Sequence, residues 1–209
     1  MKGRNPSGTR FRLLVYRRMW ERWALPCALI VPAAVALWWF TPRIPVVHSP
    51  YRHLALVPGA VALALLAYAW LAARVAAVQC RAKHLRIRTP FYPLVISYAR
   101  IKSVRPKPFG EAFATARLRG SAANWLRPYW GRTALVVELS EYPLPKGWLR
   151  LWCSPYLLAP QSSAFVLLVD DWMRLSRQID DFRSTWEMRR AERRRAAIPP
   201  SRPNRPGSW

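Results

Sequence analysis

The sequence contains few acidic residues, few histidines and few cysteines, and these shortages exclude several kinds of site. Against 34 Lys and Arg it has 10 Asp and Glu, which gives a formal net charge of +24. Only three His and three Cys are present, and no two cysteines form a CxxC pair. Zinc sites and disulfide frameworks need closely spaced groups of these residues. We therefore expect neither a metal site nor a disulfide framework.

The sequence also lacks the short motifs that carry catalysis. It has no GxSxG, no HExxH and no glycine-rich phosphate loop. The four acids within residues 170–181 lie near Arg174 and Arg177, so they are better explained as solvated partners of those cations. We expect no catalytic residues, no cofactor and a non-enzymatic function. A membrane enzyme is the least favoured alternative.

One uncharged run dominates the sequence. Residues 54–73 carry no charge over 20 positions, which matches the roughly 20 apolar residues that cross a bilayer. A buried helix of a soluble core is the alternative, but such helices rarely run this long without a polar residue. We predict that residues 54–73 span a membrane. Small residues within this run, such as Gly59, give spacings that permit close packing of helices or self-association.

A second uncharged run, residues 24–40, precedes the first. It contains two prolines, which membrane helices tolerate when neighbouring groups satisfy the freed carbonyls. A signal peptide is the alternative, but this run ends in bulky aromatics rather than in a small-residue cleavage site. The two runs predict a transmembrane hairpin over residues 24–78, with residues 41–53 as its connector.

The basic residues around the hairpin predict its orientation. Seven Lys and Arg lie in residues 1–23, two in the connector, and nine in residues 74–107, which contain no acid. Because cytoplasmic flanks carry the excess of Lys and Arg, both termini are predicted to be cytoplasmic in a multi-pass protein of the cell membrane. The first ten residues of the basic N-terminal segment are predicted to be disordered. Residues 11–23 are compatible with a short interfacial helix.

Residues 79–195 are predicted to form one small domain. Alternating runs indicate a short strand around Leu85 and Ile87 within residues 81–90, and further strands at residues 94–97, 133–141 and 147–154. Several short strands with turns between them indicate a small, mostly antiparallel sheet or barrel. Residues 110–132 interrupt the pattern with aromatics and arginines. This insertion is either an ordinary loop or a patch that contacts the membrane interface.

The last part of the domain is predicted to be a long helix over residues 162–190. Apolar residues recur at spacings of three and four from Phe165 to Trp186, with Ser162 or Ser163 as the cap. A coiled coil is the alternative, but several aromatics in the seam favour a helix that closes the domain core. The Pro-rich tail, residues 196–209, is predicted to be disordered.

The order of these segments resembles the bacterial pleckstrin-homology-like (PH-like) domains that follow one or two membrane helices. The resemblance covers about half of the chain and lies in HLRIRT (84–89), in VISYARIKSVRP (95–106) and in the helix after LLAPQSSAF (157–165). It implies an α+β fold, a split barrel or two packed sheets capped by a helix. It also implies a binding or assembly function rather than catalysis. The aromatic insertion and the length of the last helix depart from this pattern.

These observations predict a membrane-anchored scaffolding module that presents a PH-like domain to anionic lipid headgroups or to protein partners. Nucleic-acid binding through the basic tails is the alternative, and it is less favoured because no recognised nucleic-acid-binding fold accompanies the tails. The predicted contact residues are basic or aromatic. They are Arg81, Lys83, Arg86, Arg88, Arg100, Lys102, Arg105, Lys107, Trp125 and Trp130.

Overall fold

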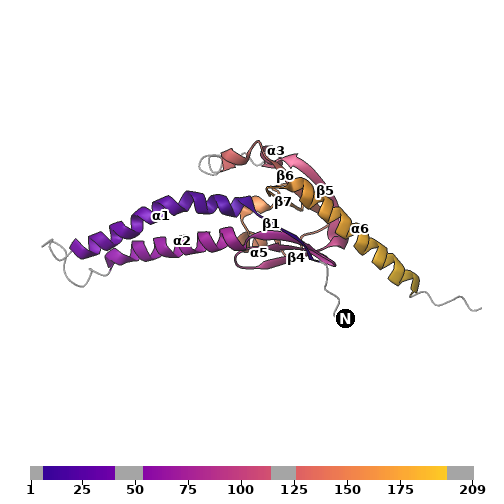
Figure 1. The fold of residues 1–209 in the computed structure, drawn as a ribbon, viewed down its shortest axis with the longest axis horizontal. Coiled ribbons are helices and arrows are strands. Elements are labelled where there is room, and N and C mark those ends of the chain that lie inside the picture. The colour runs from indigo at the N-terminus through magenta and orange to yellow at the C-terminus, as the bar shows by residue number, and fades with distance from the viewer. Residues whose placement is uncertain (1–6, 41–53, 114–125, 197–209) are drawn as a thin grey trace, which may run out of the picture.

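The computed structural model describes residues 7–40, 54–113 and 126–196, and it combines a long helical hairpin with two antiparallel sheets and a C-terminal helix (Figure 1). The hairpin consists of α1 (Leu14–Phe40) and α2 (Val57–Val75). Sheet A has the strand order β1 (Ser7–Arg12), β2 (Ala77–Arg81), β3 (His84–Arg88) and β4 (Pro93–Ser97). Sheet B has the order β5 (Ile101–Pro108), β6 (Thr133–Leu139) and β7 (Ala164–Leu167). The remaining α-helices of the described residues are α3 (Phe109–Phe113), α5 (Lys146–Trp152) and α6 (Trp172–Ala196). Three short 3-10 helices are also present: η3 (Tyr98–Arg100), η5 (Arg127–Tyr129) and η6 (Pro155–Leu157).

The hairpin is the connection between the first two strands of sheet A. β1 pairs antiparallel with β2, although the hairpin separates the two strands in sequence. At the junction the amide of Leu13 donates to the carbonyl of Ala76 at 3.2 Å. Nη2 of Arg10 donates to the carbonyls of Arg74 (3.2 Å) and Val75 (2.7 Å), which satisfies acceptors that the end of α2 leaves open. The hairpin is therefore fastened to the sheet at its base.

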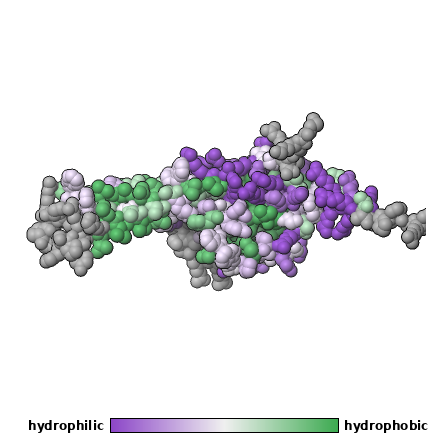
Figure 2. Space-filling view, turned by 90° about the horizontal axis from the view of Figure 1, so that it is seen from below, coloured by the Kyte–Doolittle hydropathy of each residue, from purple (hydrophilic) through white to green (hydrophobic). Residues whose placement is uncertain are grey.

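The two hairpin helices pack against each other through small residues. Beyond the base, where Leu14, Val15, Tyr16 and Ala72 pack in the two cores, the buried positions are all small: Cys27 and Ala34 on α1, and Gly59, Ala62 and Ala69 on α2. Both helices are long and apolar enough to cross a membrane. Their large apolar side chains point outwards, and Figure 2 shows hydrophobic residues gathered along the hairpin. The predicted apolar helices over 24–40 and 54–73 are therefore confirmed as helices, while the connector 41–53 lies outside the described residues.

Gly59 permits the close approach of the two helices. A Cβ atom added at this position would lie 2.9 Å from the Cβ of Ala34, so the helices would have to move apart. We expect Gly59→Val to destabilise the hairpin by about 1–3 kcal/mol, the usual cost of overpacking. Thermal unfolding in mild detergent measures this loss. Ala60→Val is the matched control, because Ala60 is exposed; equal melting temperatures for the two variants would contradict the expected packing.

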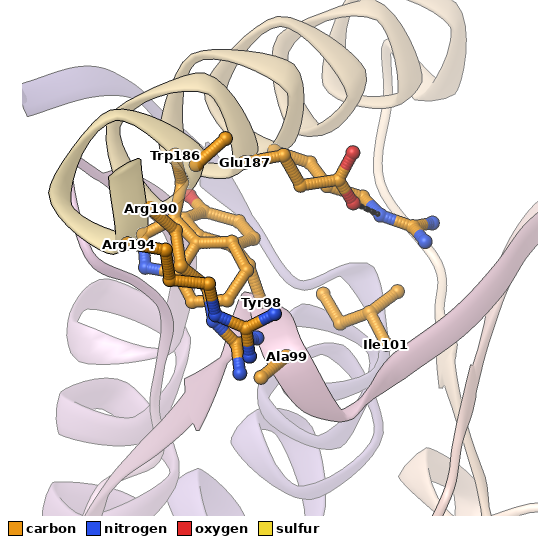
Figure 3. Close-up of a pocket in the computed structure, with 9 residues that line it drawn as sticks. Tyr98, Ala99, Ile101, Trp186, Glu187, Arg190 and Arg194 are labelled. Carbon is orange, nitrogen blue, oxygen red and sulfur yellow. Dashed lines mark hydrogen bonds and ion pairs between the residues drawn. The ribbon is translucent and has the colours of Figure 1, made fainter. Parts of the chain in front are cut away.

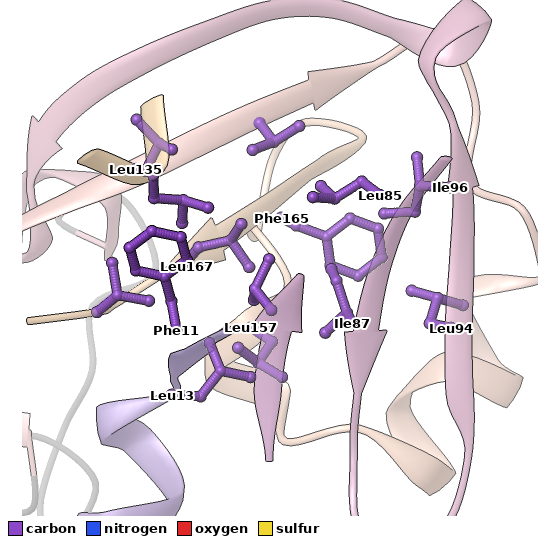
Figure 4. Packing of buried hydrophobic residues seen from close by; sticks show 14 of the residues in the cluster. Phe11, Leu13, Leu85, Ile87, Leu94, Ile96, Leu135, Leu157, Phe165 and Leu167 are labelled. Atoms are coloured by element: carbon purple, nitrogen blue, oxygen red, sulfur yellow. The ribbon is translucent and has the colours of Figure 1, made fainter. Parts of the chain in front are cut away.

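The main core lies between the two sheets and is closed by α6. Sheet A contributes Phe11, Leu85, Ile87 and Ile96, and sheet B contributes Leu135, Phe165 and Leu167 (Figure 4). The helix supplies Leu175 and Ile179, both fully buried, with Trp172, Phe182 and Trp186 packed beside them. These helical residues belong to the seam that the spacing of three and four predicted. The expected antiparallel sheets with a C-terminal helix are confirmed.

A second core covers the outer face of sheet B. Ala134 and Val136 of β6 point to this face, where they meet Phe109, Phe113 and Tyr129. β6 is therefore buried on both faces. The described ends of the predicted insertion 110–132 form α3 and η5, and their aromatics pack against this sheet. Burial of Phe113 and Tyr129 places these two side chains in the core rather than at a surface patch, and residues 114–125 lie outside the described part.

The N-terminal segment differs from its prediction. Residues 7–12 form an edge strand of sheet A instead of disordered chain, and α1 begins at Leu14 rather than continuing a separate interfacial helix. Phe11 and Leu13 point into the main core, whereas Arg10 and Arg12 point outwards. The alternation is therefore that of a strand with one buried face. The basic N-terminal segment supplies part of the domain that was predicted to begin at residue 79.

The prediction of a strand at residues 147–154 is wrong, because Lys146–Trp152 forms α5. Leu149 and Cys153 are both buried, and their spacing of four residues places them on one side of the helical turn. Apolar residues occupy both odd and even positions in this segment, so its alternation was too weak to indicate a strand. The amide of Cys153 donates to the carbonyl of Leu149 at 2.8 Å, a bond of helical spacing.

The helix predicted over residues 162–190 begins later and ends later than expected. Ala164–Leu167 forms β7, which pairs with β6, and α6 runs over Trp172–Ala196. The run from Ala164 to Val169 is buried at every position, as expected for a strand covered on both faces. The helix begins after Asp171, whose Oδ1 accepts from the amide of Arg174 at 2.9 Å. Asp171 therefore replaces the predicted serine cap.

Candidate functional site

The outer face of sheet A is basic because of the register of its strands. Arg10 lies opposite Gln79, which lies opposite Arg86. Two residues further along β1, Arg12 lies opposite Ala77, which lies opposite Arg88. Residues between these positions, such as Val78 and Ile87, are buried in the core. The five arginines of the first three strands therefore share one face, and the four strands contain no acid. The five are Arg10, Arg12, Arg81, Arg86 and Arg88.

The cations of this face lie close enough to affect one another. The pKa of Arg86 is lowered by partial burial and by the positive charges of Arg88 and Arg81. The pKa of His84 is lowered by partial burial and by Arg81 and Arg86. None of the ion pairs found within the described residues involves an arginine of sheet A. An anion bound to this face would therefore relieve a repulsion that no ion pair among the described residues offsets.

A cavity of about 350 Å³ lies at the junction of the hairpin and the sheets. We call it the junction cavity. It is lined by Arg12, Leu13, Leu14, Arg17, Trp20, Trp70, Ala73, Arg74 and Asp170. The guanidinium of Arg74 lies 4.3 Å from the ring centroid of Trp70. Three arginines and two tryptophans thus surround a space into which only one acid, Asp170, projects.

The electrostatic surroundings of the junction cavity remain positive after its ion pairs are counted. Nε of Arg17 lies 3.3 Å from the carboxylate of Glu21, and the pair is exposed, so its attraction is weak. Oδ1 of Asp170 lies 3.8 Å from Nη1 of Arg132, a residue that does not line the cavity. Arg12 and Arg74 take part in none of the ion pairs found among the described residues. This combination of arginine and tryptophan suits a phosphate group attached to an apolar molecule.

A second basic region lies at the end of α6, far from the hairpin (Figure 1). Trp186 contributes to two shallow cavities there, of about 260 and 300 Å³. Figure 3 shows Arg190 and Arg194 beside the ring of Trp186 in the first of these, and the guanidinium of Arg190 lies 5.2 Å from that ring. Lys83, Arg189 and Arg193 line the other. We call this region the α6 basic end.

The predicted contact residues are divided among several surfaces. Arg81, Arg86 and Arg88 lie together on the outer face of sheet A, and Lys83 lies at the α6 basic end. The other four cations follow β4 or lie along β5, and their side chains are exposed; they are Arg100, Lys102, Arg105 and Lys107. Trp130 is 41% exposed beside α3, and Trp125 lies outside the described residues.

Sequence reasoning missed the cations that lie before the hairpin and at its base. Arg10, Arg12, Arg17 and Arg74 were not among the predicted contact residues, although residues 11–23 were considered as an interfacial helix and the N-terminal arginines as possible phosphate contacts. The alternation from Arg10 to Leu13 would have indicated a strand with an outward basic face. Its partner, β2, lies beyond two apolar helices, so no local pattern indicated where that strand pairs.

Groups suited to nucleophilic or metal chemistry are scarce in the described chain. Within those residues no group of three or more His, Cys, Asp or Glu could hold a metal ion. Cys27, Cys80 and Cys153 are free and buried. Burial raises the pKa of Cys80 to about 12 and that of Cys153 to about 11, so both thiols stay protonated at neutral pH. Protonated, enclosed thiols are poor nucleophiles.

No family model matches this chain, and neither does any curated protein or any solved structure.

Proposed function

We propose that this protein is a membrane-anchored, non-catalytic binding module, in which α1 and α2 span the cell membrane and hold a PH-like domain at its cytoplasmic face. The domain binds anionic lipid headgroups. The observation that carries this proposal is the junction cavity, where three arginines and two tryptophans meet at the base of the hairpin, next to its uncharged runs 24–40 and 54–73.

The outward side chains of the hairpin support its insertion into a bilayer. Leu25, Leu29 and Leu37 on α1 are 68%, 63% and 55% exposed, and Val61 and Leu63 on α2 are 53% and 57% exposed. Burial of each such side chain in an apolar medium is worth about 1.5–3 kcal/mol. A hairpin that exposes this many large apolar groups is much more stable in lipid than in water.

The charges at the two ends of the hairpin support the orientation. Arg17, Arg18 and Arg22 follow the start of α1, and Arg74 lies at the end of α2, so all four lie at the end that joins the sheets. Positive residues favour the cytoplasmic side. The domain, with both termini, therefore lies in the cytoplasm.

The arrangement of strands supports the PH-like assignment. Four strands in chain order form one antiparallel sheet, three form the other, and a C-terminal helix closes the core between them. This is the architecture that the resemblance of HLRIRT and VISYARIKSVRP to PH-like domains implies. In this chain the hairpin occupies the connection between β1 and β2, so the domain is fixed at the level of the headgroups. It has no flexible linker at that junction.

Removing the arginines of the junction cavity is expected to weaken lipid binding. Each cation near an anionic surface contributes about 1 kcal/mol, so Arg12→Ser, Arg17→Ser and Arg74→Ser together should reduce retention of phosphatidylglycerol by at least about tenfold. Retention of phosphatidylcholine should change much less, because its headgroup has no net charge. Native mass spectrometry of the full chain, released from mild detergent with either lipid, counts the bound molecules. Arg10 is left unchanged because it caps α2.

The matched control removes three arginines from the α6 basic end, namely Arg189→Ser, Arg193→Ser and Arg194→Ser. This variant has the same net charge as the junction variant but should retain phosphatidylglycerol. Equal retention by both variants, at the level of the unchanged protein, would contradict the proposal. The nucleic-acid alternative would be favoured if only the control variant lost phosphatidylglycerol and if the unchanged protein shifted an oligonucleotide in a salt-dependent way.

A further inference from the structure

An apolar surface lies beside the base of α2 and is made by α5 and the turn between β3 and β4. Four of its side chains are strongly exposed: Phe91 is 57%, Tyr92 45%, Trp148 50% and Leu151 67% exposed. We call these four residues the α5 patch. Single exposed apolar residues are ordinary on protein surfaces, but a group of large ones usually marks a contact with a partner or a membrane.

The α5 patch is joined to the hairpin by a series of aromatic contacts. Tyr68 of α2 stacks on Phe91 with ring centroids 5.0 Å apart. Phe91 meets Trp152 edge-on at 5.7 Å, and Trp152 lies 5.8 Å from Trp148. The patch is therefore continuous with the surface of α2, and no polar layer separates the two along this path.

The depth of Tyr68 indicates which part of a bilayer the patch meets. Tyr68 precedes Arg74 by six residues, which corresponds to about 9 Å along a helix. It lies near Trp70, at the end of the uncharged run where the charged residues begin. Trp and Tyr concentrate at this depth in membrane proteins, because their rings are apolar and their N–H and O–H groups reach water.

The side chains of α5 are distributed as in a helix that lies along an interface. Leu149 and Cys153 point into the main core, and Trp148 and Leu151 point away from it. Lys146 and Arg150 supply cations on the same short helix, and Nζ of Lys146 donates to the carbonyl of Pro160 at 3.1 Å. Basic residues next to outward Trp and Leu suit the boundary between headgroups and acyl chains.

We propose that the α5 patch lies in the interfacial layer of the same bilayer that the hairpin spans, so that Trp148 and Leu151 contact lipid. This inference rests on the proposed membrane insertion of the hairpin. The occupant is lipid rather than a protein partner because the patch continues an apolar helix surface at the depth where the bilayer begins. The domain then has a second attachment to the membrane beside the hairpin, which prevents it from tilting away.

Site-directed spin labelling of the full chain in liposomes tests this placement. A nitroxide is attached at Leu151→Cys, with Trp148→Cys as a second site. Its collision rates with oxygen, which concentrates in lipid, and with a water-soluble nickel complex are compared. The expected ratio of oxygen to nickel collisions at both sites is several-fold higher than at Met188→Cys, an exposed position of α6 far from the hairpin. The native cysteines are buried, and the unmodified chain, treated with the same label, gives the background.

A third site separates failure of this inference from failure of the proposed function. Leu63 lies in the middle of α2 and is exposed, so Leu63→Cys should give the highest oxygen-to-nickel ratio if the hairpin spans the bilayer. A lipid-like value at residue 63 with water-like values at residues 148 and 151 overturns the interfacial placement and keeps the membrane hairpin. Water-like values at all three positions overturn both.

Discussion

Replacing Phe165 with alanine is expected to lower the free energy of unfolding by about 3–5 kcal/mol, the range for removal of a buried aromatic ring. Phe165 is 1% exposed and lies in the core between the sheets (Figure 4). In β7 it pairs with Val137 of β6, and its ring meets Tyr142 edge-on with centroids 5.5 Å apart. The surrounding side chains come from both sheets and cannot all move to fill the space that the ring leaves.

Chemical denaturation of the full chain in mild detergent, followed by near-ultraviolet circular dichroism, measures this loss. Met188→Ala is the control, because Met188 is 59% exposed and its truncation should change stability by no more than about 0.5 kcal/mol. A loss of stability at Phe165 as small as that at Met188 would mean that the two sheets do not share a core. Since a whole domain is stabilised by about 5–15 kcal/mol, the expected loss is a large part of the total.

The parts of the fold that the sequence predicted correctly are those with strong local patterns. Residues 84–88 alternate strictly between polar and apolar, and β3 forms there. Most of the apolar seam of α6 is also correct, because five aromatic or aliphatic residues recur at helical spacing. Phe165 lies in β7 and Leu168 lies directly after it, and both continued that spacing by coincidence, because every residue from Ala164 to Val169 is buried. The spacing alone did not show that the helix begins only after Asp171.

The position of the hairpin within the fold depends on a contact between residues far apart in sequence. β1 carries alternating arginines, which taken alone indicate only a basic flank of the predicted membrane segment. That these arginines lie on a sheet follows only from the pairing of β1 with β2, in which Phe11 lies opposite Val78. The same pairing brings Arg10 and Arg12 onto the face that already holds Arg86 and Arg88. Sequence reasoning therefore found three of the five arginines on this face, Arg81, Arg86 and Arg88.

Joining the two helix stubs by a short linker is expected to convert this protein into a soluble domain. In the shortened chain a Gly/Ser linker connects residues 7–20 to residues 70–196 and replaces the apolar hairpin. Trp20 and Trp70 line the same cavity, so the ends to be joined lie close together. Because the stubs keep Leu14, Val15 and Ala72, which pack in the two cores, the shortened chain should unfold cooperatively without detergent.

The fragment 79–195 is expected to remain unfolded under the same conditions, because it lacks β1. Phe11 and Leu13 are 7% and 1% exposed, and each contributes about 1.5–3 kcal/mol when buried. The fragment also lacks Val78, the buried residue of β2 that lies opposite Phe11, so the main core loses side chains from two neighbouring strands. Denaturant titration followed by circular dichroism compares the two proteins, and the shortened chain with Phe11→Asp is the control that should unfold like the fragment. If the fragment folds as stably as the shortened chain, β1 is dispensable and the hairpin is a separate anchor. If only the shortened chain folds, the hairpin is an insertion within the domain, and the base of the hairpin and the basic face of sheet A form one rigid unit.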